Sequence, residues 1–237
     1  MYTAPKVTTR VIGSRGGGAI LMGAVSVATL SLLALREWDV SGPFPARFWN
    51  ALAAFVIIGI LSESFSFTIP VGNVRTSVAF VPIIASVMLF GHPWPMFIGG
   101  VTAFVGDTFV RNKPPTQVWF NAAQFMLASG LGGLVYSRLG GSVSLDAFDF
   151  ALIPFACLVL VYFLVNHGGV ALTDLWGTGP SVRDARGRIG KDQLAADLLS
   201  SMLAVLLAFL FVKLQLLGLA ILVFALFLVA RRDVRHS

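Results

Sequence analysis

The 237 residues are 57% hydrophobic and only 12% charged, with a mean hydropathy of +0.85. Soluble domains carry about 25% charged residues, so an ordinary soluble fold is excluded and little chain is left for a soluble catalytic domain. The formal net charge of +6 would favour nucleic acid in a soluble protein, but in a membrane protein basic residues first set the topology. We therefore expect no nucleic-acid partner.

The first apolar run, residues 17–35, follows Lys6, Arg10 and Arg15 and has the general layout of a signal peptide. It is longer than a typical signal-peptide core, and it ends in Arg36-Glu37-Trp38-Asp39 in place of a small-residue cleavage site. More apolar runs follow it. We predict a retained first helix.

Seven further apolar runs cover residues 48–61, 77–90, 95–110, 117–136, 150–173, 194–212 and 216–230. A helix needs about 20 apolar residues to cross a hydrocarbon core about 30 Å thick, so the chain predicts an all-α polytopic bundle of about eight spans, with six or seven as alternatives. Residues 62–74 are neither clearly helical nor polar. They predict an interfacial or re-entrant segment, which lipid tolerates only where protein covers the backbone.

The basic residues test this topology, because cytoplasmic loops are enriched in Lys and Arg. With the N-terminus inside, thirteen of the seventeen basic residues fall in cytoplasmic segments, and only Arg36, Arg47, Arg138 and Lys213 fall outside. We expect a single integral membrane domain over residues 1–237 with both termini cytoplasmic: an N-terminal segment 1–16, a bundle 17–230 and a basic tail 231–237. We expect a multi-pass membrane protein.

Ionisable residues within lipid are costly and give a functional hypothesis by default. Asp107 and Arg111 are four residues apart near the end of the fourth run, so they share a helix face and predict a structural ion pair.

The amides Asn121 and Gln124 lie three apart and share a face of the fifth run, where they either line a polar ligand site or bond neighbouring helices. Asn166 and His167 interrupt the sixth run just before Gly168-Gly169 and complete the candidate ligand lining. His167 could titrate, bind a metal or ligate a tetrapyrrole, but it has no second histidine at ligand spacing, so a packed histidine is the stronger interpretation. We expect no metal site, and the sequence leaves any cofactor open.

The loop after the sixth run carries four basic residues that predict contact with anionic lipid or a partner, although orientation alone accounts for them; they are Arg183, Arg186, Arg188 and Lys191. Cys157 is the single cysteine, so this chain alone can form no disulfide and no cysteine-based zinc site. The sequence contains no phosphate loop, nucleophile elbow or His-Glu-x-x-His pair, and we expect no enzyme.

Four segments together resemble the N-terminal membrane module of bacterial signalling proteins, notably HD-GYP-type cyclic-di-GMP phosphodiesterases and some diguanylate cyclases. They are Gly72-Asn73-Val74-Arg75-Thr76-Ser77-Val78-Ala79-Phe80, Arg111-Asn112-Lys113-Pro114-Pro115, Phe120-Asn121-Ala122-Ala123-Gln124 and residues 130–141. Residues 216–232 look like the last helix of that module. The resemblance implies a sensory or ligand-binding module in a bacterial inner membrane.

In those proteins the final helix leads into a catalytic domain, whereas this sequence stops at Ser237. We therefore expect a non-catalytic module for sensing, ligand binding or scaffolding that acts through a partner, which is another membrane protein or a second copy of the chain. One alternative is an accessory subunit of a transport, respiratory or photosynthetic complex. Another is a small-solute transporter component resembling the substrate-binding subunit of a vitamin importer.

Overall fold

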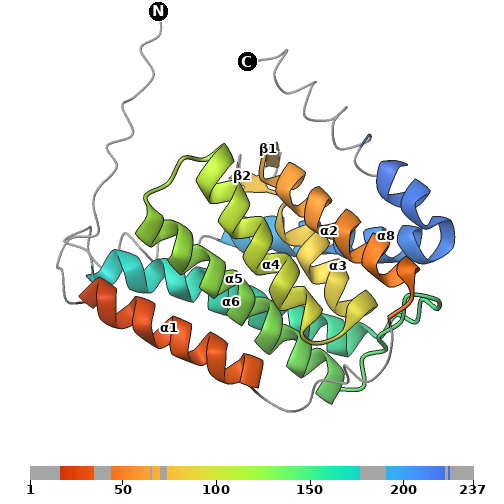
Figure 1. Ribbon diagram of the computed structural model, residues 1–237, viewed down its shortest axis with the longest axis horizontal. Coiled ribbons are helices and arrows are strands. Elements are labelled where there is room, and N and C mark those ends of the chain that lie inside the picture. The colour runs from red at the N-terminus through yellow and green to blue at the C-terminus, as the bar shows by residue number, and fades with distance from the viewer. Residues whose placement is uncertain are drawn as a thin grey trace, which may run out of the picture.

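The computed structural model describes residues 17–34, 44–64, 66–69, 74–176, 191–221 and 224. These residues form a bundle of helices with one small β-hairpin (Figure 1). The helices are α1 (Gly17–Ala34), α2 (Ala46–Ser64), α3 (Phe80–Phe90), α4 (Trp94–Val105), the π-helix η1 (Gly106–Val110), α5 (Pro115–Arg138), α6 (Leu152–Trp176) and α8 (Lys191–Leu214). The first seven predicted apolar runs each coincide with one of these helices, with η1 completing the run that begins in α4.

Local sequence signals set several helix ends. α5 begins at Pro115, because proline at the first helical position already has a helical φ and lacks an N–H that would go unpaired. α3 ends before Gly91, whose φ of 65° is a conformation that residues with a Cβ rarely adopt.

The described residues form a helical bundle, as predicted, with one short β-hairpin added to it. Strands β1 (Ser66–Ile69) and β2 (Val74–Ser77) are antiparallel, with Ser66 opposite Ser77 and Ile69 opposite Val74. β1 lies within residues 62–74, where the sequence predicted a non-helical segment. β2 begins at the last of those residues and extends to Ser77, where the sequence predicted the next apolar run to begin. Pairing gives these backbone groups partners without a helix, which is how a short non-helical segment can satisfy its hydrogen bonds. The hairpin follows the C-terminal end of α2, and β2 contacts α8 (Figure 1).

Helix α3 lies at the centre of the bundle. All eleven of its residues are buried, and α2, α4, α5 and α8 pack against it. The ring of Phe55 on α2 meets Phe90 of α3 at 5.3 Å and Phe211 of α8 at 5.4 Å, so aromatic contacts connect three helices through the core.

The outward faces of the surrounding helices are also apolar, as Leu30, Ile153 and Leu164 are each more than 60% exposed. Apolar residues on both inner and outer faces are typical of helices in a lipid environment.

Among the described residues, three helical segments are long and apolar enough to cross a membrane: Ala46–Glu63, Pro115–Arg138 and Leu152–Gly169. Four shorter apolar helical segments lie in α1, α3, α4 with η1, and α8. The count of eight spans and the cytoplasmic placement of both termini therefore stay predictions. The segments 1–16 and 231–237 and the basic residues Arg183, Arg186 and Arg188 lie outside the described residues, and Lys191 opens α8.

Candidate functional site

A cluster of charged and amide side chains gathers where α2 ends and η1 leads into α5. Asp107 is 2% exposed; its carboxylate accepts a hydrogen bond from Arg111 at 3.2 Å, pairs with Lys113 at 2.8 Å and also accepts a hydrogen bond from the Asn121 amide. Arg111 also forms an ion pair with Glu63, which is 6% exposed. We call these five residues the carboxylate cluster. Two acids meet two bases, so the charges balance.

The π-helix shapes this cluster. The Arg111 N–H donates to the carbonyl of Gly106 at 3.0 Å, five residues back, which makes a wider turn than an α-helix. Gly106 also lets α2 approach, since a Cβ there would lie only 2.6 Å from Cγ of Glu63. Single π-helical turns occur frequently at functional sites, because the extra residue redirects the side chains around it.

The Asp107–Arg111 pair is present, but sequence spacing did not predict its larger setting. Glu63 lies 44 residues before Asp107 in the sequence, and its pairing depends on how α2 packs against η1. A usable signal existed, because a carboxylate at the end of an otherwise apolar run needs a partner. Lys113 was likewise assigned to topology alone.

A second contact joins α5 to α6 through two amides. Gln124, 2% exposed, donates to the backbone carbonyl of Asn166 and to its side-chain Oδ1, the latter at 3.2 Å. Gly169 makes room for this contact, because a Cβ there would lie 2.6 Å from Nε2 of Gln124. Asn121 and Gln124 thus lie one turn apart on α5, as the spacing predicted. Their side chains contact different helices, however: Asn121 contacts η1 and Gln124 contacts α6.

A third contact joins α6 to α8. Nε2 of His167 lies 2.7 Å from Oδ2 of Asp197, which is 3% exposed, and the imidazole stacks on Phe163 with ring centroids 5.7 Å apart. We call His167 and Asp197 the histidine clasp. One ring nitrogen is therefore already engaged by a carboxylate, and the described residues contain no group of three or more His, Cys, Asp or Glu placed to hold a metal ion.

Together these contacts form a polar seam across five helices. It consists of Glu63, Asp107, Arg111, Lys113, Asn121, Gln124, Asn166, His167 and Asp197. Asn121 and Gln124 lie one turn apart on α5, and Asn166 and His167 are adjacent on α6, so the seam passes from α2 and η1 through α5 and α6 to α8. All four residues proposed to line a ligand site lie in it, and their ligand role stays a prediction.

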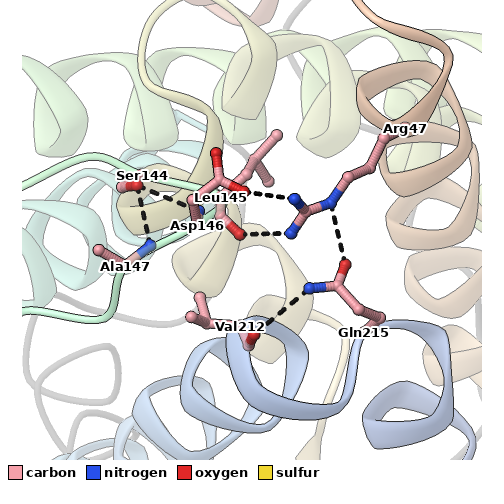
Figure 2. Close-up of polar contacts among 7 residues, drawn as sticks. All are labelled: Arg47, Ser144, Leu145, Asp146, Ala147, Val212 and Gln215. Carbon is pink, nitrogen blue, oxygen red and sulfur yellow. Dashed lines mark hydrogen bonds and ion pairs between the residues drawn. The ribbon is translucent and has the colours of Figure 1, made fainter.

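A further set of polar contacts, centred on Arg47, lies at the opposite end of the bundle (Figure 2). Arg47 at the start of α2 donates to the carbonyl of Leu145 at 3.0 Å and to the side-chain oxygen of Gln215 at 3.1 Å, and it pairs with Asp146. Gln215 follows α8 and has a positive φ of 55°. These four residues form the Arg47 latch, which ties α2, the loop between α5 and α6, and the end of α8 together.

The MASE9 family model matches residues 44–233, four fifths of the chain. The chain belongs to the MASE9 family. MASE9 is a family of membrane-associated sensor domains, so the expectation of a sensor-like membrane module is confirmed. A link to HD-GYP phosphodiesterases or diguanylate cyclases stays a prediction. Neither the curated proteins nor the solved structures contain a significant match.

The MASE9 match begins at Phe44, just before α2, and runs beyond α8, so it contains the whole polar seam and the Arg47 latch. Helix α1 precedes it. The polar seam and the Arg47 latch therefore both belong to the part of the chain that matches the MASE9 family.

Proposed function

We propose that this chain is a non-catalytic, multi-pass sensing module of a bacterial inner membrane that passes its signal to an output partner through α8. Membership in a sensor-domain family supports the sensory role. The observation that carries the mechanism is the polar seam: three sets of hydrogen bonds and ion pairs, which follow one another along α5 and α6, reach from the η1 end of the bundle to α8.

Such a seam can act as a switch because its contacts are exchangeable. A ligand shifts a protein between two states only by as much as it binds one of them better. A small polar or amphipathic ligand that competes for the amides Asn121, Gln124 or Asn166 would replace contacts between helices by contacts to itself. Charge balance makes the neighbouring carboxylate cluster sensitive, because moving one partner leaves a buried charge unpaired.

Helix α8 is the element positioned to carry the change onward. Its packing is mainly on α3, the histidine clasp links it to α6, and Gln215 at its end belongs to the Arg47 latch. A shift of the seam would therefore reach α8 near its start, while the latch restrains its end. We propose that the output partner, on another chain, responds to this movement.

Purification from the native membrane in a mild detergent, followed by mass spectrometry of co-purifying proteins and small molecules, tests the proposal. A sensing module is expected to retain a small molecule that is lost from the Asn121→Ala/Gln124→Ala variant while the fold persists. Stoichiometric membrane-protein partners without any small molecule would instead identify an accessory subunit. Uptake of a solute by vesicles containing the chain alone would identify a transporter.

A further inference from the structure

The chain turns sharply at Gln215, between α8 and a further helical stretch over residues 216–221. Gln215 has a positive φ of 55°, and its N–H donates to the carbonyl of Phe211 at 2.8 Å, a common way for a helix to end. The N–H of Gly218 then donates to the carbonyl of Gln215 at 3.1 Å. The conformation of Gln215 therefore sets the direction in which the chain leaves α8.

The stretch 216–221 packs back on the end of α8. Gly218 permits this close approach, because a Cβ there would collide with the carbonyl oxygen of Leu210. Leu219 is 3% exposed and belongs to the hydrophobic core, whereas Leu217 is 62% exposed. The position of this stretch thus depends on its contact with α8 and on the conformation of the turn.

Arg47 holds the turn from the side of α2 (Figure 2). Its Nε donates to Oε1 of Gln215 at 3.1 Å, and the Gln215 amide nitrogen donates to the carbonyl of Val212 at 3.3 Å. The other two guanidinium nitrogens contact the carbonyl of Leu145 and the carboxylate of Asp146. Because the guanidinium is planar, these two contacts aim its Nε at Gln215.

The other members of the Arg47 latch are anchored to the centre of the bundle. The N–H of Ser144 donates to the carbonyl of Met88 in α3 at 3.1 Å, and the Ser144 hydroxyl accepts from the N–H of Asp146 at 3.1 Å. Phe48, the residue after Arg47, packs its ring against α3 as well. Both charged residues thus stand on α3, and the turn is the part of the latch that is free to move away.

The ion pair of the latch is exposed to solvent, unlike the carboxylate cluster. The side chains of Arg47 and Asp146 are 44% and 77% exposed. Exposed ion pairs contribute little net stability, and salt weakens them, whereas buried pairs are screened much less. The closed and open arrangements of the latch are therefore similar in free energy, and the ionic strength of the adjoining solution shifts the balance between them.

We propose that the Arg47 latch makes this module responsive to ionic strength. Salt weakens the pair of Arg47 with Asp146, the guanidinium releases Gln215, and the stretch 216–221 changes its position against α8. This is a second input, separate from the polar seam. It rests on the proposed function only in taking the end of α8 as part of the route to an output partner. The movement itself is measured without ligand or partner, so its absence would leave sensing by the polar seam untouched.

Pulsed electron paramagnetic resonance in lipid nanodiscs measures this movement. Cys157→Ser removes the single cysteine, and Leu164→Cys and Ile221→Cys then place spin labels at exposed positions of α6 and of the stretch after Gln215. We expect one main distance at about 50 mM NaCl, and a second whose fraction rises about two- to fivefold at about 500 mM, as the loss of one exposed ion pair allows. A distance distribution that salt leaves unchanged would overturn the proposal.

Three variants separate the latch from a general effect of charge. Asp146→Asn should show the raised fraction at both salt concentrations. Asp149→Asn is the matched control, because the same loop loses the same charge outside the latch, and it should keep the response of the unaltered latch. Arg47→Lys keeps the charge but loses the planar fork that reaches three partners, so it should behave like Asp146→Asn. The proposal fails if the two asparagine variants behave alike, or if Arg47→Lys responds to salt like the unaltered latch.

Gln215→Gly tests the turn without changing any charge. Glycine adopts a positive φ readily, so the turn itself should persist while the hydrogen bond to Arg47 is lost. We expect the second distance at both salt concentrations. A single distance that appears in Gln215→Gly at low salt and still converts at high salt would show that Gln215 does not connect the latch to the stretch 216–221.

Discussion

His167 on α6 and Asp197 on α8 are 2.7 Å apart at their nearest polar atoms, and this contact fixes the start of α8 to a neighbour that it otherwise touches little. Because Asp197 is 3% exposed, its carboxylate depends on protein partners. The pair therefore stabilises the one helix through which we propose the signal leaves the seam.

His167→Ala is expected to lower the free energy of unfolding by about 1.5–3 kcal/mol, the range for a hydrogen bond to a charged group. Unfolding in detergent measures it. Leu164→Ala is the control, since that side chain is 62% exposed on the same helix and should change stability little. Additive effects of His167→Ala and Asp197→Ala in a double-mutant cycle would show that the clasp contributes nothing as a pair.

Arg111→Ala should be far more damaging than Arg47→Ala, although both arginines form ion pairs. The partners of Arg111 are buried, with side-chain exposures of 1% for Glu63 and 2% for Asp107, whereas that of Asp146 is 77%. Loss of one member of a buried pair typically costs about 3–5 kcal/mol. Loss of an exposed pair costs about 0–1 kcal/mol and less still at high salt. Chemical unfolding of both variants at two salt concentrations measures the loss of unfolding free energy. Equal losses for Arg111→Ala and Arg47→Ala would contradict this ranking.

The neighbours Gly168 and Gly169 should respond oppositely to alanine. A Cβ on Gly168 meets nothing within 4 Å, so Gly168→Ala should raise stability by up to about 1 kcal/mol through helix propensity. A Cβ on Gly169 would displace the Gln124 amide, at a cost of about 1 kcal/mol for the lost hydrogen bonding. The difference between the two variants should disappear in a Gln124→Ala background, and its persistence there would mean that another contact limits Gly169.

Gln124→Ala alone should cost about 0.6–1.7 kcal/mol, the range measured for hydrogen bonds between membrane helices. If Gln124 also contacts a ligand, that ligand should bind the variant more weakly than the decrease in stability explains, as measured by the thermal shift at saturating ligand. If Gln124→Ala leaves both the ligand affinity and the stability unchanged, Gln124 neither stabilises the helix contact nor binds the ligand.

Much of this arrangement was predictable from sequence periodicity and spacing. Apolar runs predicted the helices because each run is about as long as the helix it forms, and the four-residue spacing placed Asp107 beside Arg111. The hairpin was anticipated only in part, as a non-helical segment over residues 62–74, because the alternation in β1 covers only four residues and β2 does not alternate.

Contacts between distant segments were beyond sequence reasoning. The pairing of Glu63 with Arg111 requires knowledge of which helix faces touch, and a single sequence does not provide it. Arg47 illustrates the same limit: it was assigned to topology, while the structure gives it partners about 100 and 170 residues away.

The central position of α3 has a consequence for how the chain enters the membrane. Eleven helical residues extend about 16 Å, roughly half of a hydrocarbon core, and every one of them is covered by protein. Such a segment is too short to be stable in lipid by itself. We expect the translocon to release α3 and α4 together as one hairpin turning at Gly91, and α3 to find its final surroundings only when α8, synthesised more than a hundred residues later, closes over it.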